Sequence, residues 1–174
     1  MPQCLNININ GNIPNQNPSS QNGEEYTGGG SGNRILDAAM KYYDKFMPRG
    51  ATGNNGTYYC NALIGCTLED LGLWKGYSNA NNNSAKLKKD SRFVEIKYTS
   101  GEKAMPGDIM CIERSGKSGH NMIAHTVNSE GRVTKCLSAG SASDPKGRNH
   151  VGFINGYPKA GTSDYNNLHL FRLK

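Results

Sequence analysis

The sequence has little of what a membrane-inserted or exported chain would show. None of its 174 residues belongs to an apolar run near the length of about 20 residues that a membrane-spanning helix needs. The segment from Met1 to Asn6 has neither a basic head nor an apolar core, so we expect no secretory signal peptide. Hydrophobic residues form only 35% of the chain, and its 22 glycines indicate many turns. We therefore expect a loop-rich domain without a transmembrane segment, large enough to bury its own core.

The chain also lacks paired-cysteine motifs. Its five cysteines show no C-x-x-C spacing, so the sequence indicates neither a zinc site nor a disulfide framework, and we expect no metal and no cofactor. Three of them lie within apolar runs and are interpreted as small buried hydrophobes: Cys66, Cys111 and Cys136. Cys60 differs, because it lies at the mouth of a turn-rich segment.

Positive charge is absent from one end of the chain. Residues 1–33 carry Glu24 and Glu25 and no Lys or Arg, whereas residues 34–174 have a net charge of +8. A basic domain suits an anionic partner such as nucleic acid, a membrane surface or a cell-wall polymer. No basic stripe interleaved with aromatic residues supports nucleic-acid binding. The cluster of Lys86, Lys88 and Lys89 is typical of an ordinary solvated face.

The same charge boundary divides the chain into two units, 1–33 and 34–174. Residues 5–10 alternate apolar and polar side chains, a short strand pattern, and residues 11–32 have the Asn, Ser and Gly content of a flexible tether. Two interpretations remain open for this N-terminal arm. It is either a disordered tail or a segment whose strand adds to the sheet of a partner.

Residues 34–174 show helical patterns first and strand patterns afterwards. An apolar stripe that follows Asn33, a good N-cap, predicts a helix that Pro48 ends, and a second helix runs from Cys60 to a C-cap at Gly72. Residues 79–83 are expected to form a loop and residues 84–89 a short surface helix. The turn Glu130-Gly131 marks a hairpin. Strands are predicted over residues 93–98, 108–113, 121–127, 132–137, 151–155 and 168–173. The order predicts an α+β domain with a mostly antiparallel sheet of about five to six strands.

Cys60 and His120 have the local settings that nucleophilic catalysis requires. A thiol in the first turn of a helix lies where free backbone N–H groups and the helix dipole favour the thiolate. His120 follows a glycine at the entrance of a strand and could act as the base. His125 lies five residues later, so it points to the opposite face of the strand and is interpreted as structural. His150 also begins a strand and remains the alternative base.

Four segments together resemble a known family. Tyr59-Cys60-Asn61-Ala62-Leu63 is followed by Met105-Pro106-Gly107-Asp108-Ile109-Met110, by Gly119-His120-Asn121-Met122-Ile123 and by Glu130-Gly131-Arg132-Val133. Over about residues 34–174 this order is similar to the NlpC-like and CHAP-type cell-wall cysteine peptidases. The resemblance implies a papain-like fold in which a third polar residue, one strand after the histidine, orients the imidazole.

The sequence departs from the family at two positions. Asn61 replaces the serine that commonly follows the nucleophile. No His, Asn, Asp or Glu lies in residues 133–138, where the orienting residue belongs, so Ser138 takes that place, with Asn149 as the alternative.

The resemblance implies that Cys60 and His120 hydrolyse an amide of peptidoglycan, in the stem peptide or the cross-bridge. The expected protein is a phage product that acts at the bacterial envelope or outside the cell, either a lysin released at lysis or a virion tail-tip hydrolase docked to a tail protein through residues 1–33. An antibacterial amidase effector is a second possibility. A third is a non-catalytic structural or wall-binding module on the same fold.

Overall fold

The computed structural model describes residues 31–47, 59–75, 80–141, 144–147 and 149–174. Most of the N-terminal arm, with its strand pattern at residues 5–10, therefore lies outside the described residues. No helix in the described ranges is both long and apolar enough to cross a membrane.

Helix α1 (Ser31–Met40) packs through the apolar stripe that the sequence predicts. Ile35, Ala39 and Tyr42 are buried against the rest of the core. The helix ends at Met40, well before Pro48, and hydrogen-bonded turns follow, among them Tyr42 N–H to Ala39 O at 2.9 Å. The expectation of a helix that runs to Pro48 was wrong because the apolar stripe continues through turns.

Helix α2 (Tyr59–Asp70) is buried on nearly all sides, which explains why it carries so few polar residues. It ends as predicted: Gly72 has a φ of +67°, and Leu73 N–H bonds Leu68 O at 2.8 Å. Helix α3 (Ala80–Lys89) begins four residues before the predicted start at Ser84. The expected loop over residues 80–83 was wrong because burial of Asn83 against the core outweighs the weak helix propensity of asparagine.

The strands form one six-stranded sheet in which every neighbouring pair is antiparallel, in the order β1-β6-β2-β3-β4-β5. The turn at Gly131, whose φ is +79°, joins β3 to β4 as predicted. The strands are β1 (Phe93–Ile96), β2 (Ile109–Ile112), β3 (His120–Val127), β4 (Val133–Ala139), β5 (Val151–Asn155) and β6 (Leu168–Leu173). The predicted α+β class is thereby confirmed.

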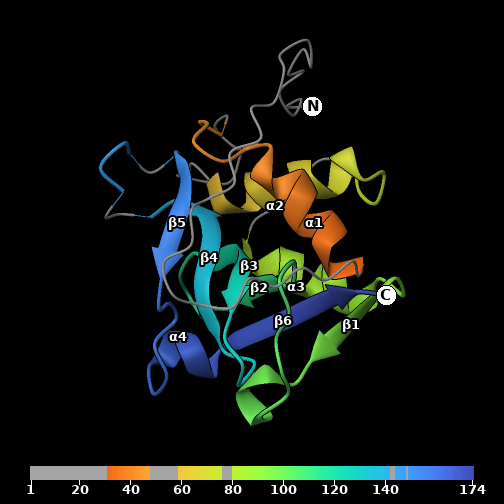
Figure 1. The fold of residues 1–174 in the computed structure, drawn as a ribbon, viewed down its shortest axis with the longest axis vertical. Coiled ribbons are helices and arrows are strands. Elements are labelled where there is room, and N and C mark those ends of the chain that lie inside the picture. Colours follow the sequence, from red (N-terminus) through yellow and green to blue (C-terminus); the bar gives the residue numbers. More distant parts are fainter. Residues whose placement is uncertain (1–30, 48–58, 76–79, 142–143, 148) are drawn as a thin grey trace.

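The two faces of the sheet bury different cores. Residues such as Ile123 and Leu137 pack against the α1 and α2 side, whereas Met122 and Cys136 belong to a second cluster on the other face. Figure 1 shows α1 and α2 together above the sheet and the short helix α4 (Ser163–Asn166) at the opposite end of the view. Neither α4 nor the 3-10 helix η1 (Tyr98–Ser100) was predicted.

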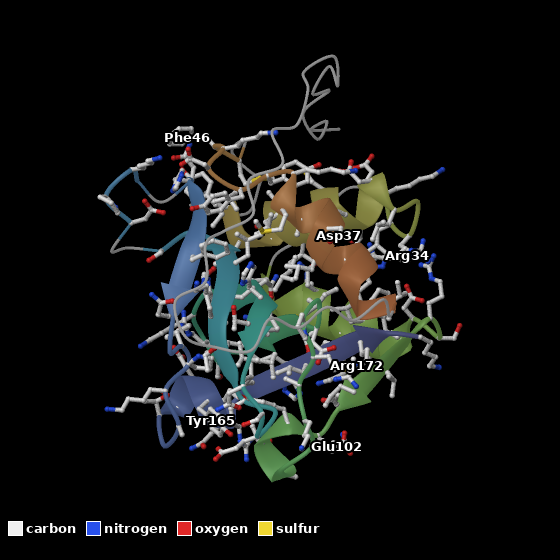
Figure 2. The ribbon with its side chains drawn as sticks, viewed as in Figure 1. Arg34, Asp37, Phe46, Glu102, Tyr165 and Arg172 are labelled. Atoms are coloured by element: carbon white, nitrogen blue, oxygen red, sulfur yellow. The ribbon has the colours of Figure 1, made fainter. Side chains whose placement is uncertain are left out.

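The Pro-Gly-Asp-Ile turn at the start of β2 is held in place by buried hydrogen bonds and an ion pair. Asp108 is fully buried; its carboxylate accepts the Met105 N–H at 2.8 Å and two hydrogen bonds from Arg172, at 2.9 and 2.8 Å. Arg172, labelled on β6 in Figure 2, thereby ties the last strand to this turn. Gly107, with a φ of +88°, provides the left-handed residue that the turn requires.

Candidate functional site

Cys60 lies in the first turn of α2 and is 7% exposed. Burial raises the pKa of its thiol; hydrogen bonds from backbone N–H groups, that of Asn121 above all, act in the opposite direction without cancelling it. The expectation that the helix start lowers the pKa below its usual value was therefore wrong. The resting thiol is protonated at neutral pH.

His120, the first residue of β3, has one polar and one aromatic contact. Its Nε2 lies 3.0 Å from Ser138 Oγ on β4, and its ring lies edge-on to Tyr157 with 6.1 Å between centroids. Burial first, and the charge of Arg114 second, lower the pKa of His120 to about 4. The imidazole is therefore neutral at neutral pH and can accept a proton.

The hydrogen bonds of Ser138 determine which ring nitrogen is basic. Its hydroxyl can donate to the carbonyls of Ala139 at 3.0 Å and Asn121 at 3.3 Å. A hydroxyl that donates its one proton to these carbonyls can only accept from the ring, so Oγ accepts a hydrogen bond from the Nε2–H of His120. This network assigns the proton to Nε2 and leaves the lone pair on Nδ1.

Cys60 and His120 approach the start of β3 from different sides of the sheet. The thiol comes from α2 and receives a hydrogen bond from the N–H of Asn121, the residue directly after His120. The side chains of His120 and Ser138 alternate with Asn121 and Leu137, so they lie on the face turned away from α2. The link that the structure gives between the two is the hydrogen bond from the Asn121 backbone, next to His120, to the thiol.

Gly119 allows the entrance of β3 to pack closely against α3 and the end of β2. A Cβ there would lie 2.2 Å from Asn81 Oδ1 and 2.6 Å from the carbonyl oxygen of Ile112, both far inside contact distance. Asn81, on α3, also bonds the backbone of the hairpin that leads to His120, accepting from Arg114 N–H at 3.3 Å and donating to Lys117 O at 3.1 Å. The hairpin that carries the imidazole is therefore anchored to α3.

His150, the alternative base, is clamped between two carboxylates. Nδ1 lies 2.7 Å from Asp144 and Nε2 lies 2.8 Å from Asp44, and Lys146 also pairs with Asp44. Because both acceptors are carboxylates, both ring nitrogens carry protons. Although burial lowers the pKa of His150, these two hydrogen bonds outweigh it and the pKa is raised. An imidazole so occupied has no free lone pair for a thiol.

The other residues considered in the sequence lie elsewhere. Asn149, the alternative to Ser138, lies beside His150 and accepts the Met47 N–H at 2.8 Å through its backbone carbonyl. The ring of His125 packs against Phe153 with 4.6 Å between centroids, as a structural residue does.

The described cysteines other than Cys60 are all buried in the core. Cys111 and Cys136 are free thiols, in keeping with their interpretation as small hydrophobes. Cys66 is fully buried too but is disulfide-bonded, which its sequence context did not predict. Within the described ranges, no group of three or more His, Cys, Asp or Glu is arranged to hold a metal ion.

Sequence reasoning missed three residues beside His120: Arg114, Tyr157 and Asp164. Arg114 bonds Asp164, 50 residues away, and Tyr157, 43 residues away. No local pattern marks such distant partners, and α4, which carries Asp164, is too short to leave a periodic signal.

Comparisons with family models and with the sequences of curated proteins find no match. Among solved structures, the chain is similar to the crystal structure of a wild type endolysin LysIME-EF1, with 18% sequence identity and a TM-score of 0.55. The similarity covers 82% of this chain and 64% of that chain, so this chain spans less than two thirds of that protein's length. At this identity, the likeness shows a shared fold.

Proposed function

We propose that this protein is a peptidoglycan hydrolase that cleaves an amide bond of the wall peptide by a cysteine–histidine mechanism. The observation that carries the proposal is that three features are linked through the start of β3, where the Asn121 N–H, next to His120, bonds the Cys60 thiol. These are a thiol in the first turn of a buried helix, an imidazole with its Nδ1 lone pair free, and a serine that fixes the ring. The endolysin fold supports a substrate in the bacterial wall.

The reaction begins from a neutral pair, because the pKa of the thiol is raised and that of the imidazole is lowered. As Cys60 Sγ attacks the carbonyl carbon, its proton passes to Nδ1 of His120. The N–H groups at the start of α2 stabilise the oxyanion. The intermediate then collapses: the C–N bond breaks, and the leaving amine takes the proton from His120. Water, deprotonated by His120, hydrolyses the thioester and restores the thiol.

The charge of the chain supports the choice of substrate. Residues 34–174 carry a net charge of +8, which attracts an anionic envelope over a distance of about 10 Å at 0.1 M salt. A phage origin, as a lysin or a tail-tip hydrolase, is part of the proposal, and the N-terminal arm would provide the contact with a virion.

Clearing of purified cell walls tests the function. We expect the wild type to clear a wall suspension and Cys60→Ala to lose at least about 1,000-fold in rate, because the nucleophile is gone. Cys111→Ala removes another buried free thiol and serves as the matched control, with clearing near the wild-type rate. Mass spectrometry of the released fragments identifies the bond. Equal clearing by Cys60→Ala and the wild type would refute the mechanism.

A wall-binding module without catalysis is the second candidate, and burial of Cys60 favours it. Its signature would be co-sedimentation with walls that release no fragments. An antibacterial amidase effector would keep the thiol chemistry, and its preferred fragments would separate it from a lysin.

A further inference from the structure

A polar cluster of Arg114, Tyr157 and Asp164 lies against the imidazole of His120. Arg114 Nε donates to Asp164 at 2.8 Å, and its Nη2 donates to Asp164 at 2.6 Å and to the Tyr157 hydroxyl at 2.8 Å. The Tyr157 hydroxyl also donates to Asp164. These residues come from the β2–β3 hairpin, the segment after β5, and α4, on which Figure 2 labels the neighbouring Tyr165.

Each member of this Arg114 cluster has a defined charge at neutral pH. Hydrogen bonds from Arg114 lower the pKa of Asp164 to about 2, so its carboxylate is ionised. Burial, with the bond to Asp164, raises the pKa of Tyr157 to about 12, so its hydroxyl is neutral. The cluster therefore holds one cation, one anion and one neutral phenol.

Two uncharged side chains contact the His120 ring. Ser138 bonds Nε2 at 3.0 Å, and Tyr157 meets the ring edge-on at an interplanar angle of 72°. A hydroxyl alone leaves the ring free to tilt about the hydrogen bond and offers no charge to the imidazolium that forms during catalysis. The charges of Arg114 and Asp164 act on the pKa of His120 in opposite directions: Arg114 lowers it and Asp164 raises it.

The cluster is also held rigidly. The backbone of Arg114 is fixed on both sides by Asn81, whose Oδ1 accepts its N–H at 3.3 Å and whose Nδ2 donates to its carbonyl at 3.3 Å. Its Nη1 donates to Ser118 O at 3.4 Å, within the same hairpin. Because its backbone is anchored in this way, the Arg114 guanidinium is held in place and can orient Tyr157 and Asp164.

We propose that Tyr157 and Asp164, held together by Arg114, are positioning residues for His120. Tyr157, edge-on to the imidazole, limits its rotation, and Asp164 supplies the negative charge that Ser138 lacks. This inference rests on the proposed function, since positioning matters only if His120 takes part in a reaction. The effect of Arg114 and Asp164 on the pKa of His120 is a property of the folded chain, whether or not the chain cleaves walls.

The test is an NMR titration of the histidine rings in the full chain, with His120→Gln to assign the signal. The charges that act on His120 are those of Arg114 in the hairpin and Asp164 on α4, and its ring contacts Tyr157 after β5 and Ser138 on β4. Removal of the cation in Arg114→Gln is expected to raise the pKa of His120 by about one pH unit, and removal of the anion in Asp164→Asn to lower it. Asp144→Asn, at His150, is the matched control and should leave His120 unchanged.

Kinetics on purified walls supply the second measurement. Tyr157→Phe keeps the ring edge and should retain kcat within about threefold, whereas Tyr157→Leu should lower kcat at least tenfold with KM unchanged. In the titration, the proposal would be overturned if the pKa of His120 shifted in the same direction in Arg114→Gln and Asp164→Asn, or shifted in neither. If the opposite shifts occur but the wild type clears no wall, the cluster assignment stands and the proposed function fails.

Discussion

Replacement of Arg172 by methionine should leave a buried charge without its partner. Asp108 is fully buried and receives both of its charge-assisted hydrogen bonds from Arg172, at 2.9 and 2.8 Å. In Arg172→Met the carboxylate keeps the Met105 N–H as its hydrogen-bond donor in the turn. Removal of one partner of a buried ion pair lowers the free energy of unfolding by about 3–5 kcal/mol.

Urea denaturation at pH 7 measures this loss. With a slope of about 2 kcal/mol per molar urea, a loss of about 4 kcal/mol moves the midpoint down by about 2 M. The deficit should shrink at pH 4. Burial raises the pKa of Asp108, and loss of the guanidinium raises it further. Between the unfolded and folded pKa values the folded state then binds more protons than the unfolded state, so stability increases as the pH falls.

Two further variants make the result interpretable. Arg34→Met, at an exposed position on α1, is the control and should change the free energy of unfolding by less than about 0.5 kcal/mol. Asp108→Asn combined with Arg172→Met removes the orphaned charge and should recover part of the loss. A loss below about 1 kcal/mol in Arg172→Met, with no dependence on pH, would refute the account of this turn.

Three other outcomes follow from the site. His150→Gln should lower the melting temperature by several degrees, because it removes the hydrogen bonds that join Asp44 and Asp144 through the ring. Wall clearing should stay within about threefold of the wild-type rate. Loss of clearing with the fold intact would identify His150 as the base. The pKa of His120 is about 4, so the acid limb of kcat/KM in wall clearing should fall near pH 4, and a midpoint at 6.5 or above would contradict the neutral resting pair. Ser138→Ala should reduce kcat about tenfold, and an unchanged kcat would remove Ser138 from the site.

The sequence predicted the fold well where the signal is periodic and local. The bounds of β5 and β6 and the C-cap at Gly72 follow from alternation and from glycine's access to positive φ. The start of α3 did not follow, because asparagine-rich residues become helical only when the core covers them. Local sequence pattern therefore predicts the bounds of regular elements, whereas packing against the core determines the bounds where the pattern is weak.

The candidate site was predictable in composition but not in electrostatics. Cys60 and His120 belong to segments that resemble the family, and Ser138 was chosen because it lies on the strand after His120. The raised pKa of the thiol depends on how deeply α2 is buried, which the helix start alone does not reveal. Nor does the sequence reveal that His150 is already occupied by two carboxylates, one of which lies 106 residues away.

The rate of Cys60 alkylation by iodoacetamide, followed by peptide mass spectrometry in the wild type and in His120→Gln, tests the central claim most directly. If the imidazole accepts the thiol proton, alkylation at pH 7 should be at least about tenfold slower in His120→Gln, while Cys111 reacts equally slowly in both proteins. Equal rates at Cys60 in the two proteins would show that the thiol and the imidazole do not act together.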